Sequence, residues 1–162
     1  MKSPLQILSN WKILLLLFAL VLLANFLLGQ FMPKEQALDL KFAYSAKEAY
    51  DSILQLDENG LKRYRFGILA LDMPYILIYG LFFSGVMFKL WGRPWTILIP
   101  ISIMVLDFFE NVMVLEMLGH LPEQHLNLGS LASIFTTGKW IFVSILGLSI
   151  LSGLIRNLFF KK

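Results

Sequence analysis

The sequence contains no cysteine. This absence excludes disulfide bonds, thiol redox chemistry, cysteine-ligated metals and lipid attachment through cysteine. The sequence also has no G-x-S-x-G, H-E-x-x-H or P-loop motif. The common signatures of serine hydrolases, zinc proteases and phosphate-binding loops are therefore missing.

Charged residues are scarce, and apolar residues are abundant. The chain of 162 residues is 57% hydrophobic and 15% charged, with a mean hydropathy of +0.70. A soluble domain is about half apolar and a quarter charged, so both values depart from soluble composition. The length fits one domain, and we predict a single integral membrane domain over residues 1–162.

Four long runs of the sequence carry very little charge. The first, residues 13–32, has no charged residue, and the other three have one or two each. About 20 helical residues cross a hydrocarbon core of ~30 Å, and lipid requires every backbone polar group to be satisfied within the segment. We therefore predict an all-α fold, a four-transmembrane-helix bundle with spans at about residues 12–32, 66–88, 94–116 and 130–156.

The first run has an alternative interpretation as a cleaved signal peptide. Its length fits a membrane span better, and no A-x-A-like cleavage site follows it. We expect it to remain in the protein as a helix.

The charges are distributed unequally between the two sides of the predicted topology. The N-terminus, the 89–93 turn and the C-terminus carry basic residues only, whereas acids outnumber bases in the two opposite loops. The positive-inside rule then predicts a multi-pass protein of a bacterial plasma (inner) membrane with cytoplasmic N- and C-termini. The net charge of +3 reflects this orientation and indicates no nucleic-acid partner. The basic residues of the predicted inner side are Lys2, Lys12, Lys89, Arg93, Arg156, Lys161 and Lys162.

Residues 33–65 form a predicted outer, extracytoplasmic segment. Apolar residues alternate with other residues over 37–44, which predicts a short extended stretch lying on an apolar surface. Ser45 and Glu48 fit a capping box that begins a short amphipathic helix, and Asn59-Gly60 predicts its C-terminal stop. Two positions are open for this helix: packed on the outer mouth of the bundle, or flat on lipid.

Three ionisable residues of the predicted spans lie equally far from the basic residue at the inner end of their own helix. The separation is 17 residues in each of the pairs Asp72–Lys89, Arg93–Glu110 and Lys139–Arg156. At 1.5 Å per residue this distance is about 25 Å. The pattern predicts a polar layer at one depth in the outer part of the bilayer.

The polar residues also share helix faces. One stripe has the spacing i, i+3, i+4 on the third span, and another has the spacing i, i+3, i+7 on the second. Pro74 lacks a backbone donor and predicts a kink beside the second stripe. The candidate ligand-binding residues of the layer are Asp72, Tyr75, Tyr79, Asp107, Glu110, Asn111 and Lys139.

Charges in hydrocarbon are costly, so they are expected to face inward and to find partners. The sequence predicts an ion pair of Lys139 with Glu110 or Asp72. Three carboxyl groups face this one lysine, so at least one acid requires a proton, Arg65 or a cationic ligand.

The layer has three interpretations. It holds the helices together, it forms a binding or catalytic site, or it binds a metal. No histidine lies in a span, and the spacing of His120, Glu123 and His125 fits no standard metal motif, so we predict no metal site and no cofactor. A set of small residues in the last span predicts close helix packing: Ser144, Gly147, Ser149, Ser152 and Gly153.

Three motifs carry a family resemblance: D-x-P at 72–74, D-x-x-E-N at 107–111 and K-W at 139–140. Together they resemble a family of small four-helix bacterial integral membrane proteins, over roughly residues 44–140. The resemblance implies a four-helix fold and the importance of these polar positions, and it implies no reaction. The Glu110-Asn111 stretch is also similar to the membrane-associated eicosanoid and glutathione metabolism superfamily, whose arginine-rich helix context is missing here.

From these features we expect a membrane module whose polar pocket in the outer leaflet binds a small amphipathic or lipid-like ligand, or docks a partner protein. The expected partners are the lipid bilayer and either that ligand or a membrane protein. One alternative is a lipid- or isoprenoid-directed enzyme that uses Asp72, Asp107 or Glu110 as acid or base, with Lys139 stabilising an anion. Another is a proton- or cation-coupled transporter, which is disfavoured because no internal inverted repeat is visible.

Overall fold

The computed structural model describes residues 3–33 and 36–159, and these residues form helices and turns without a strand. Four helical stretches are long and apolar enough to cross a membrane. They are α2 (Trp11–Phe31), the continuous stretch Glu58–Trp91, the stretch Pro94–Gly119, and α7 (Leu126–Phe159). The predicted all-α fold with four helices of spanning length is confirmed.

Two of these stretches contain more than one element. The second consists of α4 (Glu58–Phe66), the π-helical turn η2 (Gly67–Asp72) and α5 (Met73–Trp91). The third consists of a 3₁₀ turn, η3 (Pro94–Ile97), and α6 (Leu98–Gly119). The shorter elements of the chain are α1 (Pro4–Leu8), the 3₁₀ turn η1 (Leu38–Leu40) and α3 (Ala46–Leu54).

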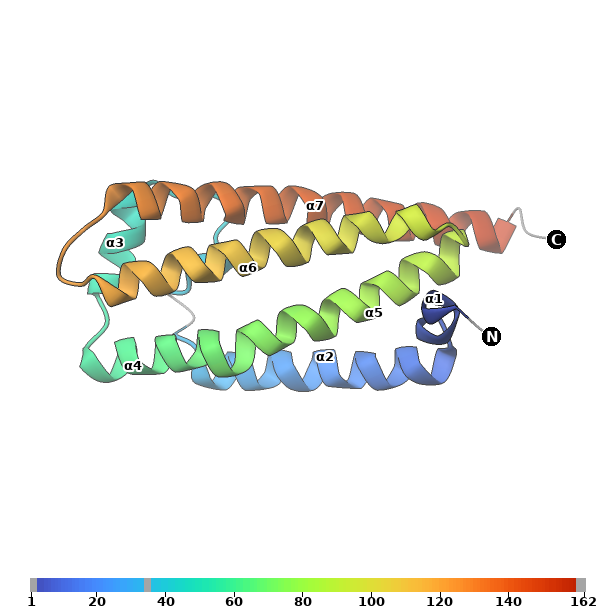
Figure 1. The fold of residues 1–162 in the computed structure, drawn as a ribbon, viewed down its shortest axis with the longest axis horizontal. Helices are drawn as coiled ribbons and strands as arrows, with labels where there is room; N and C mark the ends of the chain where they lie inside the picture. Colours follow the sequence, from blue (N-terminus) through green and yellow to red (C-terminus); the bar gives the residue numbers. More distant parts are fainter. Residues whose placement is uncertain (1–2, 34–35, 160–162) are drawn as a thin grey trace.

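The long helices are not arranged as a square bundle (Figure 1). Helices α6 and α7 lie side by side along most of their length, whereas α4 ends beside the end of α2 and α5 crosses from there toward α6 at the other end. Helix α5 packs against α1, α2, α6 and α7, and the main neighbours of α2 are α5 and η2. Helices α2 and α7 therefore flank the crossing α5 from opposite sides.

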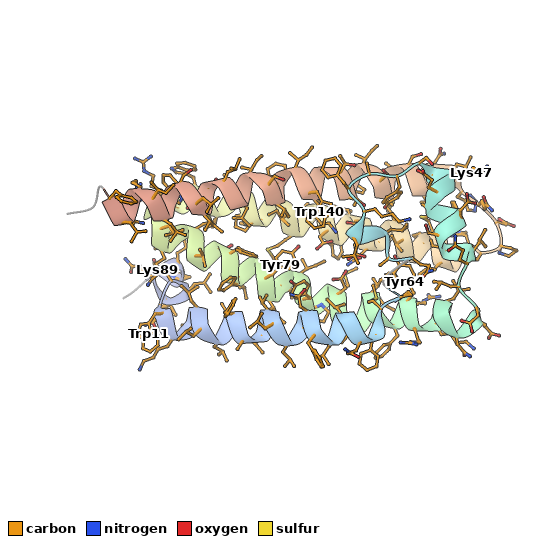
Figure 2. The ribbon with its side chains drawn as sticks, turned by 180° about the vertical axis from the view of Figure 1, so that it is seen from behind. Trp11, Lys47, Tyr64, Tyr79, Lys89 and Trp140 are labelled. Carbon is orange, nitrogen blue, oxygen red and sulfur yellow. The ribbon has the colours of Figure 1, made fainter. Side chains whose placement is uncertain are left out.

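The two ends of the bundle differ. Helix α1 and the end of α7 lie at one end, and α3 and the turn between α6 and α7 lie at the other (Figure 1). We call these the α1 end and the α3 end. Figure 2 shows Trp11 and Lys89 at the α1 end, Lys47 at the α3 end, and Tyr79 and Trp140 between them.

Basic and aromatic residues gather at the α1 end. Lys89 Nζ donates to the carbonyl of Ser9 at 3.2 Å, and the guanidinium of Arg156 lies 4.4 Å from the ring centre of Trp91. Trp11 and Trp95 are exposed. Five charged residues of the chain lie outside the described residues: Lys2, Lys34, Glu35, Lys161 and Lys162.

The predicted kink beside Pro74 takes the form of a π-helical turn. Proline has no N–H and disturbs the preceding hydrogen-bond ladder. The Met73 N–H bonds the carbonyl of Ile68, five residues earlier, and η2 ends at Asp72. A π turn rotates the side chains that follow it, and such turns are frequent at functional sites. Here it places Asp72 among the buried residues.

The predicted extended stretch over 37–44 is wrong. Leu38 to Leu40 form η1 instead, closed by the Lys41 N–H bonding the carbonyl of Leu38. The alternation fails as well, because Leu38 and Tyr44 are buried whereas Leu40 and Phe42 are both 60% exposed. A turn interrupts the two-residue period, so alternate side chains no longer share a face.

The capping box of α3 is confirmed. The Ser45 N–H donates to Glu48 Oε2 at 2.7 Å, and the Glu48 N–H donates to Ser45 Oγ at 3.2 Å. Of the two positions left open, α3 takes the one packed on the bundle, with Ala49, Tyr50 and Ile53 fully buried.

The predicted stop at Asn59-Gly60 is wrong. Helix α3 ends at the C-cap Gln55, and residues 59–60 lie in the first turn of α4. The N-cap of α4 is Asp57, whose Oδ1 accepts from the Gly60 N–H at 2.7 Å. An Asp N-cap at this position makes the same residues a helix start.

Helix α1 was not predicted. It begins with a capping box between Ser3 and Gln6, and Asn10 caps the start of α2. The helix packs on α5 near Gly85, where an added Cβ would lie 2.9 Å from the Leu8 carbonyl oxygen. The S-x-x-Q pattern at residues 3–6 is the signal that predicts this start.

A candidate ligand-binding site in the polar layer

The buried polar residues lie between two apolar clusters. One cluster, near the α3 end, includes Ile68 of η2, Val114 of α6 and Ala132 of α7. The other, toward the α1 end, includes Ile76, Ile103 and Leu146 of the same three stretches. Asp72, Asp107, Glu110, Asn111 and Lys139 lie between the two clusters along their helices, whereas Tyr79 belongs to the second cluster.

Lys139 occupies the centre of the layer and contacts two carboxyl groups. Its Nζ donates to Asp107 Oδ1 at 2.8 Å and lies 2.6 Å from Glu110 Oε2. The contact with Glu110 is an ion pair in which the angles at the two atoms do not fit a hydrogen bond. All three side chains are more than 90% buried. Of the two predicted partners of Lys139, the structure selects Glu110, and it adds Asp107.

The second helix joins the layer through two further hydrogen bonds. Tyr79 donates its hydroxyl to Asp107 Oδ2 at 2.8 Å, and Asn111 Nδ2 donates to Asp72 Oδ2 at 2.7 Å. Asp72 is thus held by Asn111, and among the described residues no ion pair joins it to Lys139. The Asp107 carboxylate has a partner on each oxygen.

Helix α2 is connected to the layer by Asn25. Its Nδ2 donates to the Tyr75 hydroxyl at 2.6 Å and to its own helix at the Val21 carbonyl at 3.0 Å. The Tyr75 and Tyr79 rings pack edge to face with centres 5.1 Å apart. This aromatic pair fixes the positions of two hydroxyl groups on the same face of α5.

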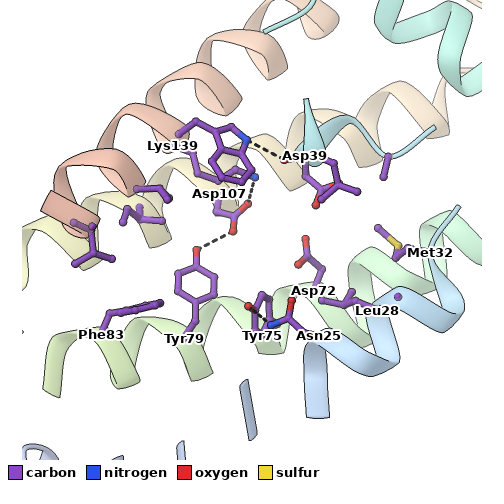
Figure 3. A pocket seen from close by; sticks show the side chains of 18 of the residues that line it. Asn25, Leu28, Met32, Asp39, Asp72, Tyr75, Tyr79, Phe83, Asp107 and Lys139 are labelled. Atoms are coloured by element: carbon purple, nitrogen blue, oxygen red, sulfur yellow. Dashed lines mark hydrogen bonds and ion pairs between the residues drawn. The ribbon is translucent and has the colours of Figure 1, made fainter. Parts of the chain in front are cut away.

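A cavity of about 610 Å³ lies beside the layer (Figure 3). Helices α2 and α7 flank it, α5 and α6 supply further walls, and Ala37, Asp39 and Leu40 line its α3 end. Asn25 of α2 and Gly147 of α7 line the cavity and are also exposed, so the cavity opens between these two helices.

The two halves of the cavity differ in polarity. All four charged residues of the lining, Asp39, Asp72, Asp107 and Lys139, are in the half near the α3 end, together with apolar residues such as Leu28 and Met32. The half toward the α1 end is lined by apolar side chains, which include Phe83, Ile103, Val143, Leu146 and Ile150. This polarity matches a molecule with a polar head and an apolar chain.

Asp39 is the acid of the site that sequence analysis missed. It belongs to η1, outside the spans, and its carboxyl group points into the cavity opposite Asp72 (Figure 3). The Trp140 indole donates to the Asp39 carbonyl at 3.1 Å and holds the turn against α7. Burial raises the pKa of the Asp39 carboxyl above its usual range, against the opposing effect of the Lys139 ammonium.

The predicted site residues divide into two groups. Asp72, Tyr75, Tyr79, Asp107 and Lys139 line the cavity. Glu110 and Asn111 lie behind them and hold Lys139 and Asp72 in place.

Of the residues that were expected to give close packing, Gly153 does so, since an added Cβ would lie 3.1 Å from Trp91 Nε1. Gly147 does not, because its Cβ would meet no atom within 4 Å. Ser144 and Ser152 are exposed and bond carbonyls of their own helix. Small size at position 147 therefore leaves open space at the cavity.

Two possible ways of neutralising the acids find no support in the geometry. Arg65 is exposed on α4, and among the described residues no ion pair joins it to the layer. Over residues 3–33 and 36–159, no group of three or more histidine, aspartate or glutamate residues is placed to hold a metal ion.

Comparison with known proteins identifies no relative: no protein-family model, no curated protein and no solved structure matches the chain.

Proposed function

We propose that this chain is an integral membrane protein, with its four long helices across the bilayer and its α1 end on the cytoplasmic side, and that its cavity binds one amphipathic, lipid-like ligand. The basic residues and exposed tryptophans of the α1 end support this orientation, because Lys and Arg concentrate on the cytoplasmic side and Trp at the membrane interface. The polar layer then lies toward the outer leaflet.

The observation that carries the binding proposal is the division of one cavity into a charged half and an apolar half. A cavity of about 610 Å³ falls within the range of roughly 300–1,000 Å³ that is typical of small-molecule sites. A few polar groups fix the orientation of a ligand in such sites, while apolar walls contribute most of the contact. The charged half would hold the head group and the apolar half the chain.

The opening between α2 and α7 supports a route for such a ligand. Both helices carry many exposed apolar side chains, such as Leu22 and Phe26 on α2 and Leu148 and Leu151 on α7. In a bilayer these surfaces would face lipid. An amphipathic molecule can then reach the cavity sideways from the membrane, without crossing water.

Ligand binding explains the site better than the other interpretations. A purely structural layer accounts for Lys139, Asp107 and Glu110 but not for the unfilled space beside them. A partner protein would need a surface rather than a cavity between helices. Of the acids in the enzyme alternative, Asp107 is a poor catalytic base, because both of its oxygens are occupied by Lys139 and Tyr79.

Gly147 provides a direct test. A side chain added there meets no atom within 4 Å and enters open space, so Gly147→Phe should fill the cavity without distorting α7. Gly119 is a matched control, because its Cβ also meets nothing, and it lies at the exposed end of α6, away from the cavity.

The measurement is native mass spectrometry of the full chain extracted in a mild, uncharged detergent. We expect one lipid-like molecule per chain in the wild type and in Gly119→Phe, and a clear loss of it in Gly147→Phe. Equal occupancy in the two variants, or no bound molecule in the wild type, would contradict the proposal.

A further inference from the structure

We infer that the head group of the ligand is a primary ammonium, which binds between the carboxyl groups of Asp39 and Asp72. This inference rests on the proposed function and specifies the ligand class of the same cavity. Three observations carry it: the balance of charges, an unpartnered buried oxygen, and the arrangement of the two carboxyl groups around the cavity.

The layer contains more acids than bases. Lys139 is committed to Asp107 and Glu110 by the contacts of 2.8 Å and 2.6 Å. No cation of the described residues pairs with Asp39 or Asp72, although both line the cavity. A cationic ligand would balance these two acids, whereas a phosphate or carboxylate head would add to the excess of negative charge.

Asp39 supplies the second observation. Its Oδ1 is buried, and no described residue donates a hydrogen bond to it. An unsatisfied buried acceptor is costly, and more so when it is charged. Asp39 also lines the cavity, so a donor located there would reach its carboxyl group.

The third observation is that two elements bring carboxyl groups to the cavity from opposite sides. Asp39 approaches the cavity from η1 and Asp72 from the end of η2, and their carboxyl groups point toward each other (Figure 3). Asn111 occupies Asp72 Oδ2, and among the described residues no partner bonds Oδ1. The hydrogen bond from Trp140 to the Asp39 backbone holds η1 in this position.

The number of donors determines the kind of cation. A primary ammonium has three N–H donors, like the lysine side chain, and can bond both carboxyl groups at once. A quaternary ammonium carries the same charge but no N–H, so it would leave Asp39 Oδ1 without a hydrogen bond. The rings of Tyr75 and Tyr79 line the same space, and aromatic faces also attract a cation.

The test compares four amphiphiles that share a twelve-carbon chain and differ in the head group: dodecylamine, dodecyltrimethylammonium, dodecanol and dodecyl phosphate. Each is titrated at pH 7 into the full chain, freed of lipid, in an uncharged detergent. The rise in unfolding temperature with amphiphile concentration gives the affinity. Binding to the cavity is defined as the part that Gly147→Phe abolishes.

We expect dodecylamine to bind the cavity about 10- to 100-fold more tightly than dodecanol, the range for hydrogen bonds to a charged group. Asp39→Asn should remove most of this preference, and Asp72→Asn provides a second variant should Asp39→Asn fail to fold. Asp51→Asn is the matched control, because Asp51 is an exposed acid of α3 outside the cavity, and it should leave the preference unchanged.

The outcomes separate the two proposals. Equal binding of all four amphiphiles at the Gly147→Phe-sensitive site, or tightest binding of dodecyl phosphate, would overturn the ammonium head and leave the lipid-like ligand in place. Equal binding of dodecylamine and dodecyltrimethylammonium would overturn the requirement for N–H donors. Absence of any Gly147→Phe-sensitive binding would overturn the proposed function as well.

Discussion

Lys139 and Asp107 form the central contact of the bundle, with 2.8 Å between the ammonium nitrogen and Oδ1. The other oxygen of Asp107 accepts the Tyr79 hydroxyl. One carboxylate therefore joins α5, α6 and α7 at the level where α5 crosses between the flanking helices. The polar layer fixes the walls of the cavity through this contact.

Removing Lys139 should destabilise the protein strongly. Lys139→Met leaves the buried carboxyl groups of Asp107 and Glu110 without a cation. Breaking a buried ion pair on one side costs about 3–5 kcal/mol in soluble proteins, and less is expected among membrane helices, whose unfolded state also finds partners. Thermal unfolding in detergent measures the loss.

The partner variants provide the control for this prediction. Asp107→Asn should cost less than Lys139→Met, because Glu110 still pairs with Lys139. The double variant should recover part of the loss, since fewer charges are then stranded. Single variants as stable as the wild type would show that the three side chains are not coupled.

Asp39→Asn should have the opposite effect on the protein freed of ligand. The variant removes a charge whose Oδ1 is buried without a partner, so we expect a gain of about 1–3 kcal/mol at neutral pH. A residue that only supported the fold would lose stability when replaced, which makes the sign of the change informative. Asp51→Asn should change the stability little, because exposed substitutions have small effects.

The pH dependence of this gain follows from the raised pKa of Asp39. The Asp39 carboxyl group has a higher pKa in the folded protein than in the unfolded chain, where its pKa is near 3.8. Its protonated form therefore favours the folded state, and this stabilisation is fully present below pH 3.8. The stabilisation is lost as the pH rises through the raised pKa. The advantage of Asp39→Asn should therefore be large at neutral pH and vanish on acidification. If the difference in stability between Asp39→Asn and the wild type grew as the pH fell, the raised pKa of Asp39 would be contradicted.

The packing of α3 on α7 gives a prediction that is independent of the charges. A Cβ on Gly129 would lie 2.9 Å from the Ala46 Cα, a backbone atom that cannot rotate away. Gly129→Val should shift α3 and lower the unfolding temperature, whereas Gly119→Val meets no atom within 4 Å at the added Cβ. Equal unfolding temperatures for the two variants would show that α3 is not held in this position.

Single cysteines test the proposed orientation, because the chain has none of its own. Ser3, Gln55 and Asn127 are exposed and lie at the two ends of the bundle, whereas Ser52 is only 8% exposed and is a poor site. In intact bacterial cells, a membrane-impermeant thiol reagent should label positions 55 and 127 but not position 3. Labelling at position 3 alone would reverse the orientation.

The polar layer could be predicted from sequence because helical geometry converts spacing into depth. Equal separations from the basic residues placed Glu110 and Lys139 at one level, and their side chains are in contact. Which acid pairs with Lys139 could not be predicted in this way. It depends on helix rotation and crossing, which bring Asp107 to Lys139 and leave Asp72 with Asn111.

The segment between the first two long helices was harder to predict. Its capping box depends on local chemistry and was found. Asp39 was missed because its position depends on a turn held by Trp140, a residue 101 positions away in the chain. Alternation alone placed Asp39 away from the apolar surface. Close helix packing was wrongly expected at Gly147. A small residue in a helix allows either a close contact with a neighbouring helix or an empty space, and the sequence does not distinguish the two.

The most direct test of the binding proposal is a density map of the full chain in lipid discs. We predict elongated density between α2 and α7, with its polar end between Asp39 and Asp72 and its chain passing Gly147 toward the α1 end. The same map of Gly147→Phe should lack it. A cavity that contains only water, or one closed by direct contact of α2 with α7, would contradict the proposed function.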